Sequence, residues 1–562
     1  MLRDAPQNAQ GEDTTAGDFR LKPEVSFAHM RGMLLGLGLC AISALHVASQ
    51  ADQQPPTFRA DTHLVQVTVV VQDGRLNPVT DLAAADFRVF EDGKEEPIAL
   101  FSADSRSPTT PAANVSSGAA IVSNQVPTSG GVTVILFDRL NTAWSDQGQA
   151  KQNIIKFLSQ VAPTERIGFY VLDSSSVSIV HDFTGDTRSL LRALGRVQGQ
   201  ISRETMIAEE KTPTIASSGG MSGAMDAQLD AALARMDEKI KADALKNRAD
   251  ATLSALEAVA RHLGGIPGRK NLIWVSSSFP LSFNDGFGTR SVYTEVSIAT
   301  RAIADANVSI YPVDARGLMG SSAVVTSRPT YASLHSEMPA SDSMEMLADR
   351  TGGVAYTNRN DLGRAISRAV DDARFSYTLG YYPENVKWDG HFRKISVKVR
   401  RSGVNVRHRS GYLALPPPPQ TSESRQNALV RALASPLNAI ALPLTVGLER
   451  AGNEELTVSL RLSLSAIRLS QTAPDIWEGS VDVAIAQALP NGQLAKALDV
   501  TVPLRLTTAM HDQALREGLN LTRRVRPDPA AHTLRIAVRD PATGSVGSVA
   551  VSADMIRSVL GK

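Results

Sequence analysis

Hydrophobic and polar residues follow two different rhythms along this chain. From 58 to 103, apolar residues recur at every second position, as in LVQVTVVVQD, and this period predicts β-strands. From 132 onward, short continuous apolar runs such as VTVILFD and NLIWVSS are separated by stretches with helical spacing. Continuous apolar runs are typical of strands that are buried on both faces of a sheet. The pattern therefore predicts a β segment followed by an α/β region.

Strands and helices alternate through 131–374, which predicts an open, mostly parallel sheet with helices on both faces. The predicted fold class is thus α/β. The longest helix is predicted from Met225 to Leu263 and ends at a Gly-Gly pair. Its apolar residues Leu229, Leu233 and Met236 recur at helical spacing, so we expect them to face the core.

Composition shifts divide the chain further. Residues 104–130 are rich in Ser, Thr, Pro and Gly, and Pro416–Pro419 form a stiff spacer. Beyond the spacer, alternating segments separated by turns are typical of a β-sandwich. We expect Tyr377, Tyr381 and Tyr382 to pack the α/β region against the first β segment. The predicted organisation is an extension with a signal or anchor segment (1–50), a β segment (58–104), a linker (105–130), an α/β domain (131–374), a β extension (375–415), a Pro-rich linker (416–426) and a β-sandwich domain (427–562).

The N-terminal region carries an export signature. Arg31 is followed by an apolar stretch from Gly32 to Ala48 and then by a Pro-containing exit, as in a secretory signal. An uncleaved membrane anchor or a buried helix are the alternatives. A start at Met30 or Met33 would suit the signal better than a start at residue 1. We therefore expect an exported protein of the periplasm, the cell surface or the medium, with a membrane contact only through this segment if it stays uncleaved.

Composition excludes several functions. The net charge of +1 provides no basic field for nucleic acid, so no nucleic-acid partner is expected. The single cysteine, Cys40, rules out a disulfide framework and a zinc site built from several thiolates. No G-x-S-x-G or H-E-x-x-H motif occurs. His181-Asp182 offers half of a catalytic pair, but a strand end at the surface explains these two residues better.

Several motifs together resemble one family. VTVILFDRLNT, RIGFYVL with VSIVHDFTGD, GIPGRKNLIWVSSSFP, LADRTGGVAYTNRNDL and FSYTLGYYP are similar to von Willebrand factor type A (VWFA)-related proteins of the acidobacterial type. The upstream DLAAADFRVFEDGKEEPIALFS resembles the β segment that precedes the module in that family. The resemblance covers roughly 58–413. It implies a Rossmann-like von Willebrand factor A module, export, and binding or adhesion rather than catalysis.

The resemblance also implies a place for a metal-ion-dependent adhesion site. Such sites use Asp-x-Ser-x-Ser after the first strand, a later Thr and a later Asp, because hard cations prefer oxygen ligands. Here Asp138 matches, and the remaining candidate ligands are Thr142, Thr252 and Ser277. Leu140 replaces one hydroxyl residue and a run of serines replaces the last carboxylate, so we expect a degenerate site for Mg²⁺ or Ca²⁺. The alternative is that Asp138 caps the next helix or bonds its own loop.

These observations favour an exported, non-catalytic binding protein. Its partner, a protein or a surface glycan, is expected to contact the rim at Asp138 and Asn141. A hydrolase that uses the same crevice and a purely structural component of the cell envelope remain as alternatives.

Overall fold

The computed structural model describes residues 64–561 except for fourteen internal gaps. These gaps are 106–119, 126–130, 161–164, 174–175, 204–205, 208–222, 267, 278–281, 285–288, 317–339, 358–361, 417–420, 453 and 492. The predicted signal segment, 32–48, lies outside the described residues. Within the described part of the chain, no helix combines the length and the apolar character needed to cross a membrane.

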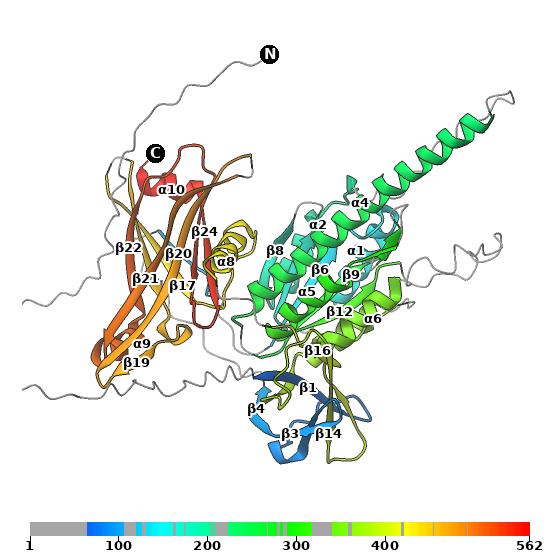
Figure 1. Cartoon of the computed structure of the whole chain (residues 1–562), viewed down its shortest axis with the longest axis horizontal. Helices are drawn as coiled ribbons and strands as arrows, with labels where there is room; N and C mark the ends of the chain where they lie inside the picture. The colour runs from blue at the N-terminus through cyan, green and yellow to red at the C-terminus, as the bar shows by residue number, and fades with distance from the viewer. Residues whose placement is uncertain are drawn as a thin grey trace, which may run out of the picture.

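A five-stranded sheet forms the centre of the α/β module (Figure 1). The spatial order of its strands is β12-β9-β6-β7-β8, and only β8 runs antiparallel to its neighbour. Every residue of β6, β7, β9 and β12 is buried, as their continuous apolar runs predict. The prediction of a mixed α/β fold with a parallel sheet is confirmed. The strands are β6 (Val132–Asp138), β7 (Ile167–Leu172), β8 (Val177–Thr184), β9 (Lys270–Ser276) and β12 (Val308–Asp314).

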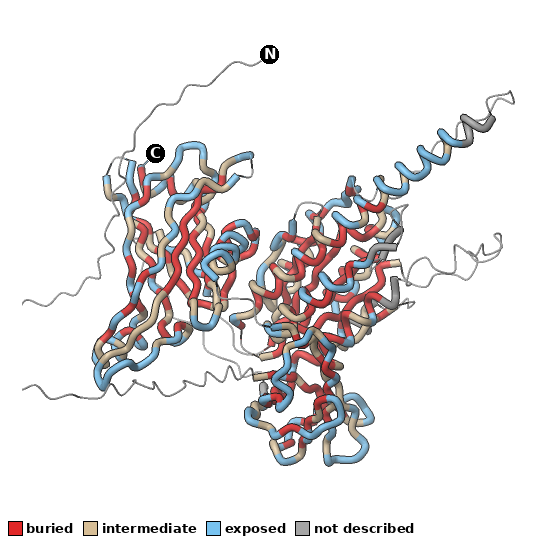
Figure 2. The backbone as a smooth tube through the Cα atoms, in the orientation of Figure 1, coloured by how far each residue is buried: buried red, intermediate tan, exposed pale blue. Residues whose placement is uncertain are grey.

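Helices cover both faces of this sheet and enclose two cores (Figure 2). One core contains Leu136 and Trp274 under α4, α5 and α6, and the other contains Phe137 and Val275 under α1, α2 and α7. Neighbouring residues of one strand thus enter opposite cores, because side chains alternate across a sheet. The helices are α1 (Trp144–Leu158), α2 (Thr187–Arg196), α4 (Gly223–Leu263), α5 (Tyr293–Asp305), α6 (Ala340–Thr351) and α7 (Leu362–Asp372).

Helix α4 differs from its prediction in one respect. Its C-terminal half packs on the sheet, whereas its N-terminal half projects beyond the module (Figure 1). Leu229, Leu233 and Met236 are therefore exposed, at 51%, 38% and 63%, and the expectation that they face the core is wrong. Helical spacing shows that these residues share a face, but it does not show whether a neighbour covers that face.

A β module is built from segments on either side of the α/β module. Strand β1 pairs with β13 and β15, and β2 pairs with β14, so the stretches predicted as 58–104 and 375–415 form one body. Tyr377 and Tyr381 are fully buried in it, whereas Tyr382 is exposed. The strands are β1 (Val65–Asp73), β2 (Phe87–Glu91), β3 (Lys94–Glu96), β4 (Ile98–Ser105), β13 (Phe375–Tyr381), β14 (Phe392–Val399), β15 (Val404–Arg407) and β16 (Gly411–Leu413).

Two antiparallel sheets follow in the C-terminal module, and residues from both belong to one hydrophobic core. One sheet contains β22, β18, β17 and β5, and the other contains β19, β20, β23, β24 and β21. Strand β5 comes from the stretch 105–130, which was predicted to be a linker only, and it pairs with β17. The strands are β5 (Ala120–Ser123), β17 (Leu444–Arg450), β18 (Leu456–Leu462), β19 (Ser470–Ala473), β20 (Ile476–Ala488), β21 (Leu494–Thr507), β22 (Leu519–Val525), β23 (Thr533–Arg539) and β24 (Val546–Ser552).

Short elements complete the molecule. Helix α8 begins inside the predicted Pro-rich linker, where the Thr421 side chain accepts a hydrogen bond from the Ser424 N–H and so caps its first turn. The remaining elements are α8 (Ser422–Ala434), α9 (Thr508–Glu517), α10 (Ala553–Leu560), the 3₁₀ turns Ala84–Asp86 and Leu464–Ala466, and the hairpin of β10 (Ser282–Asn284) and β11 (Thr289–Ser291).

Candidate binding site at the carboxyl edge of the central sheet

The parallel strands bring their carboxyl ends to one edge of the sheet. Asp138 ends β6, Ser276 ends β9 and Asp314 ends β12, and the three strands are neighbours. Open α/β sheets bind ligands at such an edge. The loop between β6 and α1, residues 139–143, lies here and carries most of the predicted site.

Asp138 is fully buried and accepts four hydrogen bonds. The Asn141 backbone N–H donates to Oδ1 at 2.9 Å. Three donors reach Oδ2: Asn141 Nδ2 at 2.8 Å, Trp274 Nε1 at 2.9 Å and Ser276 Oγ at 3.0 Å. Burial raises the pKa of the Asp138 carboxyl above its ordinary value, and these hydrogen bonds act in the opposite direction. The carboxylate is therefore satisfied from inside the protein.

Asn141 connects Asp138 to helix α4. Its Nδ2 also donates to Thr252 Oγ1 at 2.7 Å, and that hydroxyl donates to the Arg248 carbonyl at 2.7 Å. The Arg248 guanidinium donates to Asn141 Oδ1 from two nitrogens, each at 3.3 Å. Thr252 lies inside α4 and not on a loop, and one helical turn separates it from Arg248. The Asn141 side chain thus connects a buried positive charge, that of Arg248, to the Asp138 carboxyl.

The other two predicted ligands do not join this network. Thr142 Oγ1 is buried and has no hydrogen-bond partner in the described part of the chain. Ser277 Oγ lies 3.3 Å from Asp146 Oδ2. The serine that reaches Asp138 is the preceding residue, Ser276. The alternation along β9 gives the reason: Leu272 and Trp274 share a core with Leu136, so Ser276 faces the same side as Asp138.

These residues do not fit a divalent cation. Three donors already reach Asp138 Oδ2, and the groups from Asn141 and Trp274 are N–H groups that can only donate. Arg248 adds a positive charge to the same network. Among the described residues, no group of three or more His, Cys, Asp or Glu side chains is placed to hold a metal. As they lie in this structure, Asp138, Thr142, Thr252 and Ser277 are not arranged as the ligands of one cation.

The predicted contact residues are also out of a partner's reach. Asp138 is 0% and Asn141 is 2% exposed, so neither can touch a macromolecule at this edge. Charges nearby are paired: Arg139 Nε donates to Asp173 Oδ1 at 2.7 Å, and Arg316 donates to both oxygens of Asp314.

Trp144 is the exposed group next to this loop. It begins α1 and is 56% exposed. Its ring lies against Gly199, where a Cβ would come within 2.5 Å of the ring. Gln147 holds this surface in place, because its Nε2 donates to the carbonyls of Thr142 and Gln200, and its Oε1 accepts from the Gln200 N–H. The sequence analysis did not select Trp144, although its place after the Asp138 loop was a usable signal.

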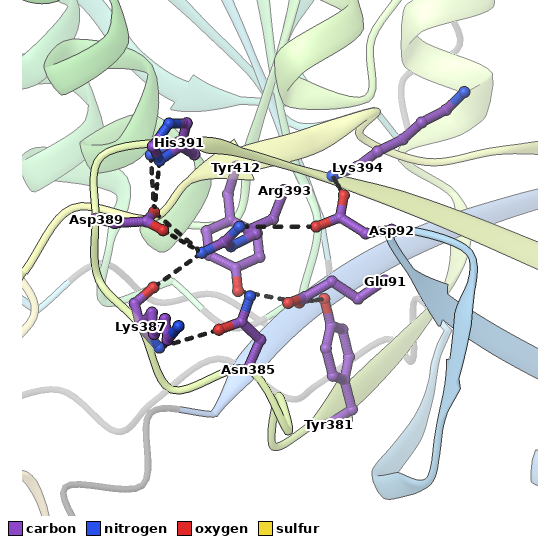
Figure 3. A network of polar contacts seen from close by, with 10 residues as sticks. All are labelled: Glu91, Asp92, Tyr381, Asn385, Lys387, Asp389, His391, Arg393, Lys394 and Tyr412. Atoms are coloured by element: carbon purple, nitrogen blue, oxygen red, sulfur yellow. Dashed lines mark hydrogen bonds and ion pairs between the residues drawn. The ribbon is translucent and has the colours of Figure 1, made fainter.

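A second polar network lies in the β module (Figure 3). The buried Glu91 accepts hydrogen bonds from the hydroxyls of Tyr381 and Tyr412 at 2.8 and 3.0 Å. Asp389 accepts from the His391 N–H and from Arg393, and these contacts lower the pKa of its carboxyl to about 2. The network ties the turn between β13 and β14 to β2, which is a structural role.

Comparisons with known proteins add the following findings. Neither a family model nor a curated protein matches the chain. Among solved structures, the VWA domain of SpRpn10 is similar at 14% identity and a TM-score of 0.15, over 33% of this chain and 88% of that chain. The pilus adhesin SpaC from Lactobacillus rhamnosus GG is similar at 10% identity and a TM-score of 0.23, over 76% of this chain and 54% of that chain.

Proposed function

We propose that this protein is an exported, non-catalytic binding protein of the von Willebrand factor A-related type, which attaches to a protein or a surface glycan. The contact surface is the platform formed by Trp144 on the 198–200 segment, next to the Asp138 loop. The observation that carries the proposal is that the large aromatic ring of Trp144 is half exposed and yet packs closely against Gly199. Tryptophan is enriched among residues that dominate binding energy at interfaces.

Binding at this platform needs no metal ion. Asp138 and Asn141 support the loop from inside instead of touching the partner, and Arg248 supplies the positive charge that a cation would bring. The network fixes the loop before a partner arrives, which lowers the entropic cost of binding. The export signature at 32–48 and the two antiparallel sheets at the C-terminus, which we propose form a β-sandwich, suit a protein that presents this module outside the cell.

Catalysis is disfavoured at the same edge. A hydrolase needs a nucleophile or a carboxylate that a substrate can reach. Asp138, the carboxylate at the centre of this edge, is enclosed by four donors. This arrangement favours a binding surface beside the Asp138 loop over a catalytic site.

The proposal is tested with the full chain immobilised and exposed to washed bacterial cells and to a glycan array. Trp144→Ala is expected to reduce binding at least tenfold. Gly199→Ala is expected to weaken it as well, because the new methyl displaces the ring without removing it. EDTA is expected to have no effect.

Ile298→Ala is the matched control, because Ile298 is a similarly exposed apolar residue on α5. Loss of binding in both Trp144→Ala and Ile298→Ala would point to general damage. Unchanged binding in Trp144→Ala would move the contact surface elsewhere. No binding to any cell or glycan would favour a structural envelope component.

A further inference from the structure

The N-terminal part of α4 carries apolar side chains that nothing covers among the described residues. We call this part, residues 228–241, the arm, because it projects beyond the α/β module (Figure 1). All residues from 231 to 236 are exposed, so no side of the helix lies against a described neighbour there. Four exposed apolar residues nonetheless follow one another at steps of four, three and four positions, and we call them the seam: Leu229, Leu233, Met236 and Ile240.

The seam faces away from the module to which α4 belongs. Ala249 and Leu256 are buried in the core under α4, whereas Asn247 and Ser254 are exposed. Asn247 and Ser254 follow Ile240 by about two and four helical turns, so they continue the line of the seam. The seam is therefore not an extension of the stripe that faces the core. A partner can cover the seam without meeting the sheet of the same chain.

The spacing of the seam favours a helical partner. Apolar residues at alternating steps of three and four positions form the contact line of two helices that wind around each other. Ile240 and Leu229 occupy the two kinds of position at which a β-branched residue and a leucine favour a parallel two-stranded coiled coil. Exposed apolar patches on soluble proteins mark interaction sites. A second helix along the seam would bury these side chains.

Charges beside the seam select the partner and its direction. Asp230 and Asp237 each directly follow a seam residue and lie on one flank, whereas Lys239 directly precedes a seam residue and lies on the other flank. In a parallel pair of identical arms, each flank faces the opposite flank of its partner, so the carboxylates face Lys239. An antiparallel pair would place carboxylates against carboxylates. Lys241 pairs with Asp237 at 2.7 Å and so offsets only one of the two acidic charges.

We propose that the arm forms a parallel two-stranded coiled coil with the arm of a second copy of this chain, so that the protein self-associates as a dimer. Arg248, further along α4, contacts Asn141 at the carboxyl edge of the central sheet, so the arm projects from that edge. A parallel pair therefore points the carboxyl edges of both sheets in the same direction. The proposal rests on the seam and its flanking charges and does not depend on the function proposed for the Trp144 platform.

Sedimentation velocity of the full chain over a concentration series tests the proposal. Because the seam is short, we expect a transient dimer with a dissociation constant of about 10–100 µM. Leu233→Gln is expected to weaken dimerisation at least tenfold, since it removes an apolar side chain from the middle of the seam. Ala231→Gln is the matched control at an exposed position on the opposite face of the arm, and it should dimerise like the parent.

Cysteine crosslinking tests the direction of pairing in a Cys40→Ser background, which contains no other cysteine. Leu229→Cys should form a disulfide-linked dimer, because a parallel pair places residue 229 beside its copy. An antiparallel pair aligned along the seam would separate the two copies of residue 229 by about 16 Å, too far for a disulfide, and would bring 229 beside 240. A mixture of Leu229→Cys and Ile240→Cys should therefore yield no disulfide between the two variants.

Three outcomes would overturn the proposal. A monomer at every concentration would assign the seam to a segment of the same chain or to a different protein. Equal dimerisation of Leu233→Gln and Ala231→Gln would place the dimer contact elsewhere. A disulfide between Leu229→Cys and Ile240→Cys, without one between two Leu229→Cys chains, would reverse the direction of pairing.

Discussion

Replacing Asp138 with alanine removes the acceptor of four buried hydrogen bonds. Two of the donors have alternatives, because the Ser276 hydroxyl can rotate and Asn141 Nδ2 keeps Thr252. Trp274 Nε1 and the Asn141 backbone N–H lose the acceptor that Asp138 provides. A buried donor left without an acceptor costs about 1–3 kcal/mol. The variant no longer buries a charge, and this offsets part of the cost of the unpaired donors. We therefore expect a net loss of about 2–5 kcal/mol in the free energy of unfolding.

A local probe is required because a chain with several modules does not unfold in one step. Trp274 is fully buried and contacts Asp138 directly, so its fluorescence reports on this site. Urea denaturation is followed in a parent in which the other three tryptophans are replaced by phenylalanine. Thr142→Val is the matched control on the same loop. Its hydroxyl is buried and lacks a partner among the described residues, so the change should cost less than about 1 kcal/mol.

Two results would refute this reasoning. If Asp138→Ala unfolds within about 1 kcal/mol of the parent, the four hydrogen bonds are not what holds the loop. If Thr142→Val destabilises as much as Asp138→Ala, the buried hydroxyl has a partner and the site is organised around another group.

Three further predictions follow from other features. The thermal midpoint should be the same in EDTA, Mg²⁺ and Ca²⁺, and a rise that Asp138→Ala abolishes would show that the carboxylate holds a cation. Gly353→Ala should lower the free energy of unfolding by at least about 3 kcal/mol, because its Cβ would lie 1.8 Å from the Ile310 carbonyl oxygen. Gly148→Ala, the control in open space on α1, should raise the free energy of unfolding by about 0.5–1 kcal/mol in the same urea assay. The lowered pKa of Asp389, about 2 against an ordinary 3.8, means that its contribution is present above pH 4 and is lost as the pH falls toward 2. Asp389→Asn should therefore flatten the decline, between pH 4 and 2, of the urea midpoint followed through the fluorescence of its neighbour Trp388, and an identical decline in both proteins would assign that loss to other groups.

The central sheet could be predicted because its signal is local. The segments 132–138 and 270–276 are buried throughout and carry the apolar runs VILF and LIWV, which are typical of strands buried on both faces of a sheet. Strand β5 could not be predicted this way, since its four residues sit among Ser, Thr and Pro and gain their order from pairing with β17, over 300 residues later. The exposure of Leu229 also depends on tertiary structure, because no neighbour covers that part of α4 among the described residues.

The same contrast between local sequence signals and tertiary structure applies to the site at Asp138. Asp138 was identified because it ends a predicted strand and matches the first residue of the adhesion-site motif that the resemblance implies. The donors that come from other elements were not, because Trp274 and Ser276 lie on β9 and meet Asp138 only after folding. A ligand pattern counts oxygen atoms along the sequence. It does not show whether their lone pairs are already used by N–H groups.

The divided β module sets an order for folding during synthesis. Val65 of β1 pairs with Tyr381 of β13, about 300 residues later. At roughly 5–20 residues per second, the first strands emerge about 15–60 s before their partners exist. The α/β module between them contains all of its own sheet strands and can fold in that interval. Its completion brings the two flanking segments together, so a delay in folding the α/β module leaves β1 and β2 with open edges that are prone to aggregation.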